Sequence, residues 1–401
     1  IVYGDVLQDN RSSQVLMPVS EGYVLACRTT VGEVPVTVEV PEQLGCQGGK
    51  FTDALENMRL VDGALFPRRE ELSPQSFAQV CDVSQPQPDD GLSDLDRLSR
   101  SISMKTGIKD IVCPPAVMRK LPDALRAEDG RVTAILARQC GCCRVVDIRP
   151  GNHAERHYGT AIDIGTTTVA VQLVDLSGGE VLATLNDYND QVVCGLDVIS
   201  RINYARHPER LKELRKRVLK TINGLLRRAI SDCGIKADEI HDAVISGNTT
   251  MIHLLLGISP EYIRLEPYTP AVMKVPFVTA GEVGVGINPC SVIHFSPCVG
   301  SYVGGDITAG LLCTDIASGT SDVSLFMDIG TNGEIAVGNG EFLMTCACSA
   351  GPAFEGGGIG CGMRATRGAI EKVKIDRDTG MPDCRVIGDA KPLGICGSGM
   401  I

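Results

Sequence analysis

The stretch AIDIGTTTVAVQLVD, residues 161–175, decides the fold of this chain, because its apolar run breaks for Gly-Thr-Thr-Thr directly after an aspartate. Residues 161–164 read as a buried strand, and the apolar period of two across residues 169–175 predicts a second strand. The four residues between them therefore form the turn of a hairpin. Glycine lets a ligand approach the backbone closely, and successive threonines supply hydroxyl and N–H groups suited to phosphate oxygens.

Asp163, directly before this turn, is the first candidate for chemistry. A carboxylate at such a position can hold a divalent cation, usually through water, against phosphates bound at the turn. For a single turn of this kind, an ordinary hairpin without a ligand is the simpler interpretation. The residues expected to bind phosphate here are Gly165, Thr166, Thr167 and Thr168.

The motif recurs in LFMDIGTNGEIAV, residues 325–337, where the sequence predicts a turn at Asn332 and Gly333 between two apolar strands. Two Asp-Ile-Gly-Thr hairpins in one chain form an internal repeat, which is stronger evidence than either alone. Carried on two similar domains, they can close on a triphosphate from opposite sides, with Asp163 and Asp328 flanking the metal. The phosphate-binding candidates of this copy are Gly330, Thr331, Asn332 and Gly333.

Two further segments carry glycine-rich turns. AVISGNTTMIHLLLG, residues 243–257, predicts a strand that runs through Gly247, Asn248 and Thr249 into an apolar helix, a suitable crossing between domains. His253 lies on that helix and is expected to be a packed core residue rather than a ligand. GICGSG, residues 394–399, predicts a close-approach turn before a helix, which suits adenine and ribose. Its candidate residues are Gly397, Ser398 and Gly399.

The composition excludes two classes of partner. With 43% hydrophobic and 22% charged residues, the 401-residue chain resembles a soluble globular protein of two or more domains. No apolar run approaches the roughly 18 residues that span a bilayer, and no secretion signal opens the chain. We therefore expect a cytoplasmic protein without membrane contact. A net charge of −11 argues against a nucleic-acid partner.

The basic run KELRKRVLKTINGLLRR, residues 212–228, is the one feature that suggests nucleic acid. Its apolar residues, from Leu211 to Leu225, fall at helical spacing after Pro208. This pattern predicts an amphipathic helix with a solvated basic face, which is the plainer interpretation.

The four turn segments, in this order, resemble the superfamily of acetate and sugar kinases, heat-shock chaperone ATPases and actin. The resemblance covers roughly residues 158–401. It assigns the two Asp-Ile-Gly-Thr segments to the phosphate motifs, residues 246–249 to the first connecting motif and residues 397–399 to the adenosine motif. It implies ATP binding but does not name the use of the ATP.

The sequence around these motifs is similar to one family in this superfamily, the reductive activators of corrinoid proteins. The similar segments are YGTAIDIGTTTVAVQLVDL, SGNTTM, SYVGGDITAGLL and SAGPAFEGGGIGCGMRATRGAIEKV. In that family an ATPase of this fold follows a 2Fe-2S ferredoxin domain, a linker and a small middle domain. The resemblance implies duplicated actin-like, ribonuclease H-like α/β ATPase domains, preceded by a small α/β domain and the last part of a β-grasp ferredoxin.

We expect four regions along a fragment of a longer protein. Residues 1–41 would be the C-terminal part of a truncated ferredoxin domain, residues 42–94 a linker, residues 95–156 the small α/β middle domain and residues 157–401 the ATPase domain, truncated at its C-terminus. Helices near residues 94–106 and 116–127 and strands at 111–112, 132–137 and 144–148 are expected in the small domain.

The 17 cysteines are scattered and odd in number, unlike a secreted disulfide framework, so we expect most to be reduced and buried. The cluster at residues 140–143 lacks paired Cys-x-x-Cys units, and metal binding is not expected there. Residues 22–41 resemble the final hairpin of a plant-type ferredoxin, which implies that Cys27 is a 2Fe-2S ligand. The loop that carries the other three ligands is absent from the chain.

The resemblance also implies a mechanism. ATP binding and hydrolysis would drive the one-electron reduction of a corrinoid cobalt from Co(II) to Co(I) through the 2Fe-2S cluster, in support of methyl transfer. Asp163 and Asp328 would position magnesium and water, with Asp306 in a Gly-Gly-Asp turn as a weaker candidate. The implied partners are a corrinoid protein of a methyltransferase system and an external low-potential electron donor, with a homodimer left open.

Three alternatives share the nucleotide site. A metabolite kinase of this fold would need a substrate pocket with a general base, and no segment singles one out. An activator of 2-hydroxyacyl-CoA dehydratases would carry a 4Fe-4S cluster between two subunits and no ferredoxin domain. A non-catalytic module would use the cleft only as an ATP-controlled binding surface.

Overall fold

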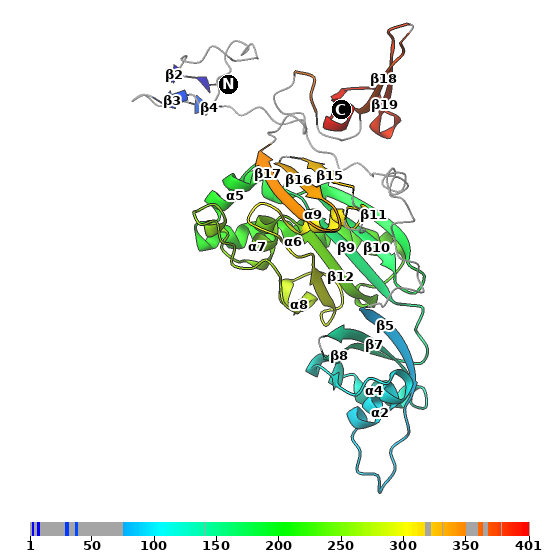
Figure 1. Ribbon diagram of the computed structural model, residues 1–401. Coiled ribbons are helices and arrows are strands. Elements are labelled where there is room, and N and C mark those ends of the chain that lie inside the picture. The colour runs from blue at the N-terminus through cyan, green and yellow to red at the C-terminus, as the bar shows by residue number, and fades with distance from the viewer. Residues whose placement is uncertain are drawn as a thin grey trace. The chain divides into compact units, whose positions relative to one another are not determined.

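The computed structural model divides into two compact units, Lys50–Ser349 and Ile1–Gly49 with Ala350–Ile401 (Figure 1). The described residues are 2–3, 6–8, 29–31, 37–38, 75–139, 141–316, 322–330, 332–349, 360–363, 368–377 and 379–400. The predictions for Cys27, Cys140 and Thr331 lie outside these residues.

The first part of the larger unit is a four-stranded sheet with strand order β5-β7-β8-β6. Its strands are β5 (Ser76–Asp82), β6 (Ile111–Val112), β7 (Arg131–Gln139) and β8 (Cys142–Pro150), and its helices are α2 (Asp94–Thr106), α3 (Pro115–Met118) and α4 (Leu121–Ala127). The predicted helices and strands of this region are confirmed, with one predicted helix divided into α3 and α4. Residues 76–82, within the segment expected to be a linker, form β5 and pair with β7.

A six-stranded sheet, with order β11-β10-β9-β12-β14-β13, forms the centre of the larger unit. Its strands are β9 (Tyr158–Ile164), β10 (Thr168–Asp175), β11 (Glu180–Tyr188), β12 (Ile240–Gly247), β13 (Val278–Thr279) and β14 (Val292–Phe295). The antiparallel pairing of β9 with β10 confirms the predicted hairpin. β12 runs parallel to β9, which brings the residues after both strands to the same edge of the sheet.

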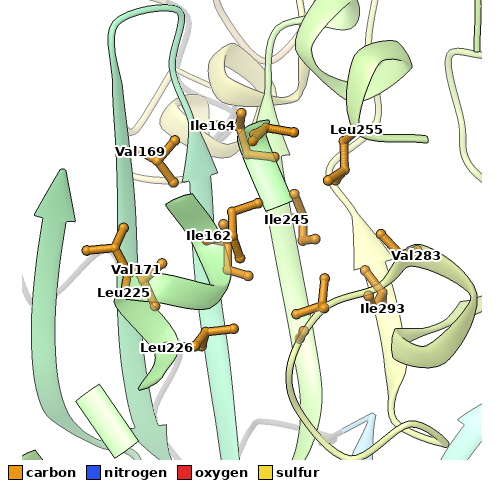
Figure 2. Close-up of a cluster of buried hydrophobic side chains, with 14 of the residues drawn as sticks. Ile162, Ile164, Val169, Val171, Leu225, Leu226, Ile245, Leu255, Val283 and Ile293 are labelled. Atoms are coloured by element: carbon orange, nitrogen blue, oxygen red, sulfur yellow. The ribbon is translucent and has the colours of Figure 1, made fainter. Parts of the chain in front are cut away.

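Helix α6 (Pro208–Cys233) covers one face of this sheet, as its apolar spacing predicts. Leu214, Val218 and Ile222 are fully buried, and Figure 2 shows Leu225 and Leu226 among side chains of β9, β10 and β12. Each fully buried side chain of this size contributes roughly 1.5–3 kcal/mol. The other helices of this region are α5 (Val198–Tyr204), α7 (Thr249–Leu256) and α8 (Ala280–Val283).

The second Asp-Ile-Gly-Thr segment forms a separate three-stranded antiparallel sheet of β15 (Ser324–Ile329), β16 (Asn332–Gly338) and β17 (Leu343–Ser349). Helix α9 (Gly305–Leu311) packs on one face, where Ile307 and Leu311 meet Phe326 and Ala336. The hairpin is confirmed, but the prediction that its turn lies at Asn332 and Gly333 is wrong. Both residues lie in β16, because Ile329 already pairs with Gly333.

The smaller unit contains two short strand pairs, β1 (Val2–Tyr3) with β4 (Thr37–Val38) and β2 (Val6–Gln8) with β3 (Thr29–Val31). It also holds a three-stranded sheet of β18 (Ala369–Ile375), β19 (Pro382–Val386) and β20 (Gly394–Ile395), followed by α10 (Gly397–Met400). The helix predicted to follow GICGSG begins earlier, at Gly397 within that segment. Within the described part of the chain, no helix combines the length and apolar character needed to cross a bilayer.

Candidate nucleotide and metal site

The turn between β9 and β10 is held from inside the protein. Gly165 has to be glycine, because a Cβ there would lie 2.7 Å from the carbonyl oxygen of Thr168. The Asn189 side chain donates from Nδ2 to the carbonyl of Gly165 at 2.9 Å, and its backbone N–H donates to the carbonyl of Thr167 at 2.8 Å. These bonds fix the loop before any ligand arrives, as a phosphate-binding turn requires.

Arg201 of α5 supports the same turn, and the sequence analysis missed it. Its guanidinium is fully buried, and it donates to the carbonyl of Thr166, to the carbonyl of Gly195 at 2.9 Å and to Gln191 Oε1 at 3.1 Å. A signal was present in the sequence, since Arg201 shares the buried stripe of α5 with Val198 and Ile202. A cation on a buried helical stripe needs acceptors, and here one of them is the Thr166 carbonyl of the turn.

The predicted connecting motif packs directly against this turn. Asn248 caps α7 by accepting the N–H of Met251 at 2.9 Å and donates from Nδ2 to Thr166 Oγ1 at 3.2 Å. A Cβ on Gly247 would lie 2.8 Å from the carbonyl oxygen of Ile164, so the two strand ends touch backbone to backbone. The structure therefore brings the first phosphate candidate and the connecting candidate together.

The start of α9 joins the same place. A Cβ on Gly304 would lie 2.3 Å from Cα of Asn248, and Thr249 Oγ1 donates to the carbonyl of Gly300 at 2.5 Å. Asp306 follows in the first turn of α9, so the predicted Gly-Gly-Asp turn is instead a helix start. The loop before α9 therefore packs against the connecting motif, and Asp306 follows directly after this contact.

His253 is a core residue, as predicted. Its ring is fully buried, with Nδ1 2.7 Å from the carbonyl oxygen of Thr249 and Nε2 accepting the N–H of Ala271 at 3.1 Å. Burial lowers the pKa of His253, which keeps the ring neutral. Both ring nitrogens have backbone partners, so the side chain ties α7 to the chain at Ala271.

Four carboxyl groups gather beside these elements: Asp163, Asp306, Asp328 and Glu334. The three aspartates are the predicted catalytic residues, and Glu334 was not predicted. Asp328 and Glu334 are directly opposed in the register of β15 and β16, so their side chains share a face. Glu334 is only 7% exposed, whereas Asp163 and Asp328 keep exposed surfaces.

The negative charges of these carboxyl groups act on one another. Although Asp163 keeps an exposed surface, the protein around its carboxyl group displaces much of its water, and this desolvation, with the charges of Asp306 and Asp328, raises the pKa of Asp163 to about 7. Burial also raises the pKa of Glu334 to about 7, again with contributions from Asp306 and Asp328. The pKa values of Asp306 and Asp328 are raised as well, mainly by burial. Such mutual repulsion is relieved when a cation binds.

A hydrated magnesium ion fits this group of carboxylates. Oxygen ligands suit this ion, which commonly keeps several of its waters and binds one or two carboxylates. Among the residues that the structure describes, no three His, Cys, Asp or Glu side chains are placed to hold a metal together. The fit is therefore to a cation held partly through water.

The remaining candidates divide between the two units. In the larger unit, the N–H of Gly330 donates to the carbonyl of Asn332 at 2.8 Å, and Gly333 is buried. In the smaller unit, a Cβ on Gly399 would lie 2.3 Å from the carbonyl oxygen of Ile370, and Ser398 Oγ lies 3.1 Å from Cys396 Sγ. Gly397, Ser398 and Gly399 lie in α10, and Gly399 approaches the backbone of β18 closely.

The fold and this site define the class of protein as an actin-like α/β ATPase fold of the ASKHA type. Three family models match successive parts of the chain: the linker region of RACo at residues 68–155, its middle region at residues 158–319 and its C-terminal ASKHA domain at residues 322–401. The chain belongs to this family, the reductive activators of corrinoid proteins.

Individual relatives agree with this assignment. The corrinoid activation enzyme RamQ of Eubacterium limosum is 37% identical over 260 residues, which are 64% of this chain and 43% of RamQ. A reductase of the methylated amine-specific Co(II) corrinoid protein from Methanosarcina barkeri is 28% identical over 279 residues, which are 61% of this chain and 49% of the reductase.

A solved structure, the reductive activator for a corrinoid, iron-sulfur protein, is 41% identical with a TM-score of 0.76. It matches 100% of this chain, which covers 64% of that protein. The chain thus spans less than two thirds of each of these three relatives.

Proposed function

We propose that this protein is an ATP-dependent reductive activator, which supports the one-electron reduction of a corrinoid protein from Co(II) to Co(I). The observation that carries the proposal is the position of α9, which bears Asp306: it packs against the connecting motif beside the first hairpin and against the sheet that carries Asp328. Asp163 and Asp328 come from the repeated hairpins, as expected of a site that closes on a triphosphate. We take the corrinoid substrate of this proposal from the relatives named above.

The residues of the site have distinct roles in this proposal. Thr166, Thr167 and Thr168 receive phosphate oxygens of ATP at a loop that Asn189 and Arg201 hold in shape. Asp163 and Asp328 would hold magnesium through water and would orient the water that attacks the terminal phosphate. Magnesium, when bound, neutralises phosphate charge. Asp306 is not assigned as a ligand, but its negative charge acts on Asp163 and so favours a cation at the same site.

The electron balance of the reaction is simple. One electron leaves an external low-potential donor and reaches the corrinoid, where it converts Co(II) to Co(I) without a proton. In the full-length protein, a 2Fe-2S cluster with Cys27 among its ligands would pass this single electron. ATP binding and hydrolysis favour the reduced corrinoid by changing the shape of the complex, which requires different affinities for its two states. Co(I) is the nucleophile that methyl transfer needs.

The experiment uses the full-length protein, expressed and reconstituted without oxygen. The visible spectrum of a Co(II) corrinoid protein is followed under reductant, with and without ATP. A Co(I) band that requires both ATP and this protein supports the proposal. If no band forms with any of a panel of corrinoid proteins while ATP is still hydrolysed, the proposal is wrong, and acceptors of metabolite kinases or 2-hydroxyacyl-CoA dehydratases become the next substrates to test.

A further inference from the structure

A shallow groove of about 430 Å³ lies along α6 and beside Gly284, the residue that ends α8. Five of its eight lining residues are cationic and none is acidic. The cationic residues are Lys212, Arg215, Lys216, Lys220 and Arg227. The whole chain has a net charge of −11, so the groove is a positively charged region on a negatively charged protein.

The helix fixes the direction of these charges. Lys212, Lys216 and Lys220 follow one another at intervals of one turn, so they lie on one side of α6. The apolar stripe of the same helix is buried against the sheet, which holds α6 in place with its lysines exposed. From Lys212 to Arg227 the helix advances about 22 Å, at roughly 1.5 Å per residue.

The wall of the groove is pre-organised. Arg215 donates from Nε to the carbonyl of Leu255 at 3.0 Å and from Nη2 to the carbonyl of Val283 at 2.8 Å, which are carbonyls near the ends of α7 and α8. Asn223 donates to the carbonyl of Gly284 at 3.0 Å and accepts the N–H of Gly286 at 2.7 Å. A partner that binds here therefore meets a rigid surface.

Much of the positive charge stays unneutralised. Lys212 pairs with Glu209 at 2.9 Å and Lys220 pairs with Asp190 at 2.6 Å, and both lysine side chains are 73% exposed. Such exposed pairs are weak and easily exchanged for others. Lys216 and Arg227 are also exposed, and they make no ion pair or hydrogen bond with the residues that the structure describes.

The shape of the groove selects the kind of partner. A row of cations about 22 Å long exceeds the reach of a single small anion, and the open groove offers no enclosed pocket for one. Nucleic acid would be repelled by the remaining negative charge of the protein. An acidic protein surface needs only a few complementary charges, which steer association and set its dependence on salt.

We propose that this groove docks an acidic surface of the corrinoid protein, an inference that rests on the function proposed above. The groove lies on the helix that supports the first hairpin, because α6 packs against Val169 and Val171 of β10. Docking there places the partner against the body that carries the phosphate-binding turn, without occupying that turn.

The test compares two double variants of the full-length protein. Lys216→Glu with Arg227→Glu reverses two charges of the groove, while Lys109→Glu with Arg119→Glu makes the same change in net charge at exposed positions near β6 and α3. Binding to the corrinoid protein used in the reduction assay is measured at low and moderate salt. The groove variant is expected to bind about tenfold more weakly at low salt, with a smaller salt dependence, and the control within about twofold of wild type.

ATP hydrolysis without partner is expected to be unchanged in both variants, which shows that they are folded. If the wild-type protein forms Co(I) and the groove variant binds the corrinoid protein as tightly as wild type, the docking inference is wrong and the proposed function stands. If the wild type neither binds nor reduces any corrinoid protein, both proposals fail. Binding of duplex DNA that the groove variant alone loses, with corrinoid-protein binding unchanged, would also overturn the inference.

Discussion

The two Asp-Ile-Gly-Thr hairpins share a sequence motif but differ in their surroundings. In the first hairpin, Val169 and Val171 are fully buried beneath α6. In the second, Leu325 is 59% exposed and Met327 is 53% exposed among the described residues. The difference shows that the motif determines the hairpin, whereas the neighbouring helices determine what the hairpin packs against.

The residue opposite each aspartate on the neighbouring strand also differs. Asp163 faces Ala170 in the register of β9 and β10, whereas Asp328 faces Glu334 in the register of β15 and β16. The first hairpin therefore leaves room beside its aspartate, and the second adds another carboxyl group. We infer that the first hairpin contributes mainly a rigid turn and the second mainly negative charge for a cation.

The largest effect is expected from removing the charge that both hairpins contribute. Asp163→Asn and Asp328→Asn keep the shape of each side chain, and each is expected to reduce ATP hydrolysis about 10²- to 10³-fold, because the magnesium and the attacking water lose their position. Steady-state hydrolysis measures this, with Asp232→Asn on the exposed side of α6 as the matched control. Normal corrinoid reduction by the double variant, with hydrolysis lost, would contradict a role for hydrolysis in the reaction.

The next largest effect is expected from removing Arg201, which supports the first turn. Arg201→Ala leaves the carbonyls of Thr166 and Gly195 without their donors and opens a cavity, so we expect a loss of about 3 kcal/mol in the free energy of unfolding. Urea unfolding measures it, and Arg201→Lys is expected to recover part of the loss. The control is Arg206→Ala, whose exposed pair with Glu261 at 3.3 Å is worth less than about 1 kcal/mol. Equal losses in the two alanine variants would contradict the role given to Arg201.

The sequence predicted those features that depend on near neighbours in the chain. The period of two around Gly165 predicts the first hairpin, and the helical spacing after Pro208 predicts α6, because each pattern meets one large apolar surface. Asp306, by contrast, was only a weaker candidate. Its place in the site depends on the close approach of Gly304 to Asn248, which no local pattern reveals.

Glu334 and β5 were missed for the same physical reason. Glu334 follows Asn-Gly, which reads as a polar turn, yet it lies in β16 and is only 7% exposed. β5 follows a looser segment, and it is a strand because β7 supplies its hydrogen-bond partners. In both cases, tertiary contacts outweighed local propensity.

A smaller effect is expected from removing the charge of Glu334, which only the second hairpin carries. The pKa of Glu334 is raised from 4.5 to about 7, so the stability contributed by its protonated form is present below pH 4.5 and is lost as the pH rises through about 7. Glu334→Gln carries no charge, and at pH 8 without magnesium we expect it to be about 2 kcal/mol more stable than wild type. Its stability should also fall less between pH 6 and pH 8.

Urea unfolding at the two pH values measures the effect of Glu334→Gln. The control is Glu341→Gln, an exposed residue in the loop between β16 and β17 of the same sheet. Buried histidines such as His157, whose pKa is lowered to about 4, favour folding at higher pH and oppose the trend of the carboxyl groups. The comparison is therefore made between variant and wild type, and the same pH dependence in both would show that Glu334 is not part of the repelling group.

The smallest effect compares the two turns at the same glycine of the motif. In Gly165→Ala, the new Cβ would lie 2.7 Å from the carbonyl oxygen of Thr168, so the turn has to shift, at a cost of about 1 to 2 kcal/mol. In Gly330→Ala, the nearest atom is the carbonyl oxygen of Asn332 at 3.7 Å, an ordinary contact, and the expected change is within about 0.5 kcal/mol. Thermal unfolding of the two variants measures the difference. Equal losses would mean that the second turn is as tightly determined as the first, and the distinction between a rigid turn and a charge-bearing hairpin would have to be withdrawn.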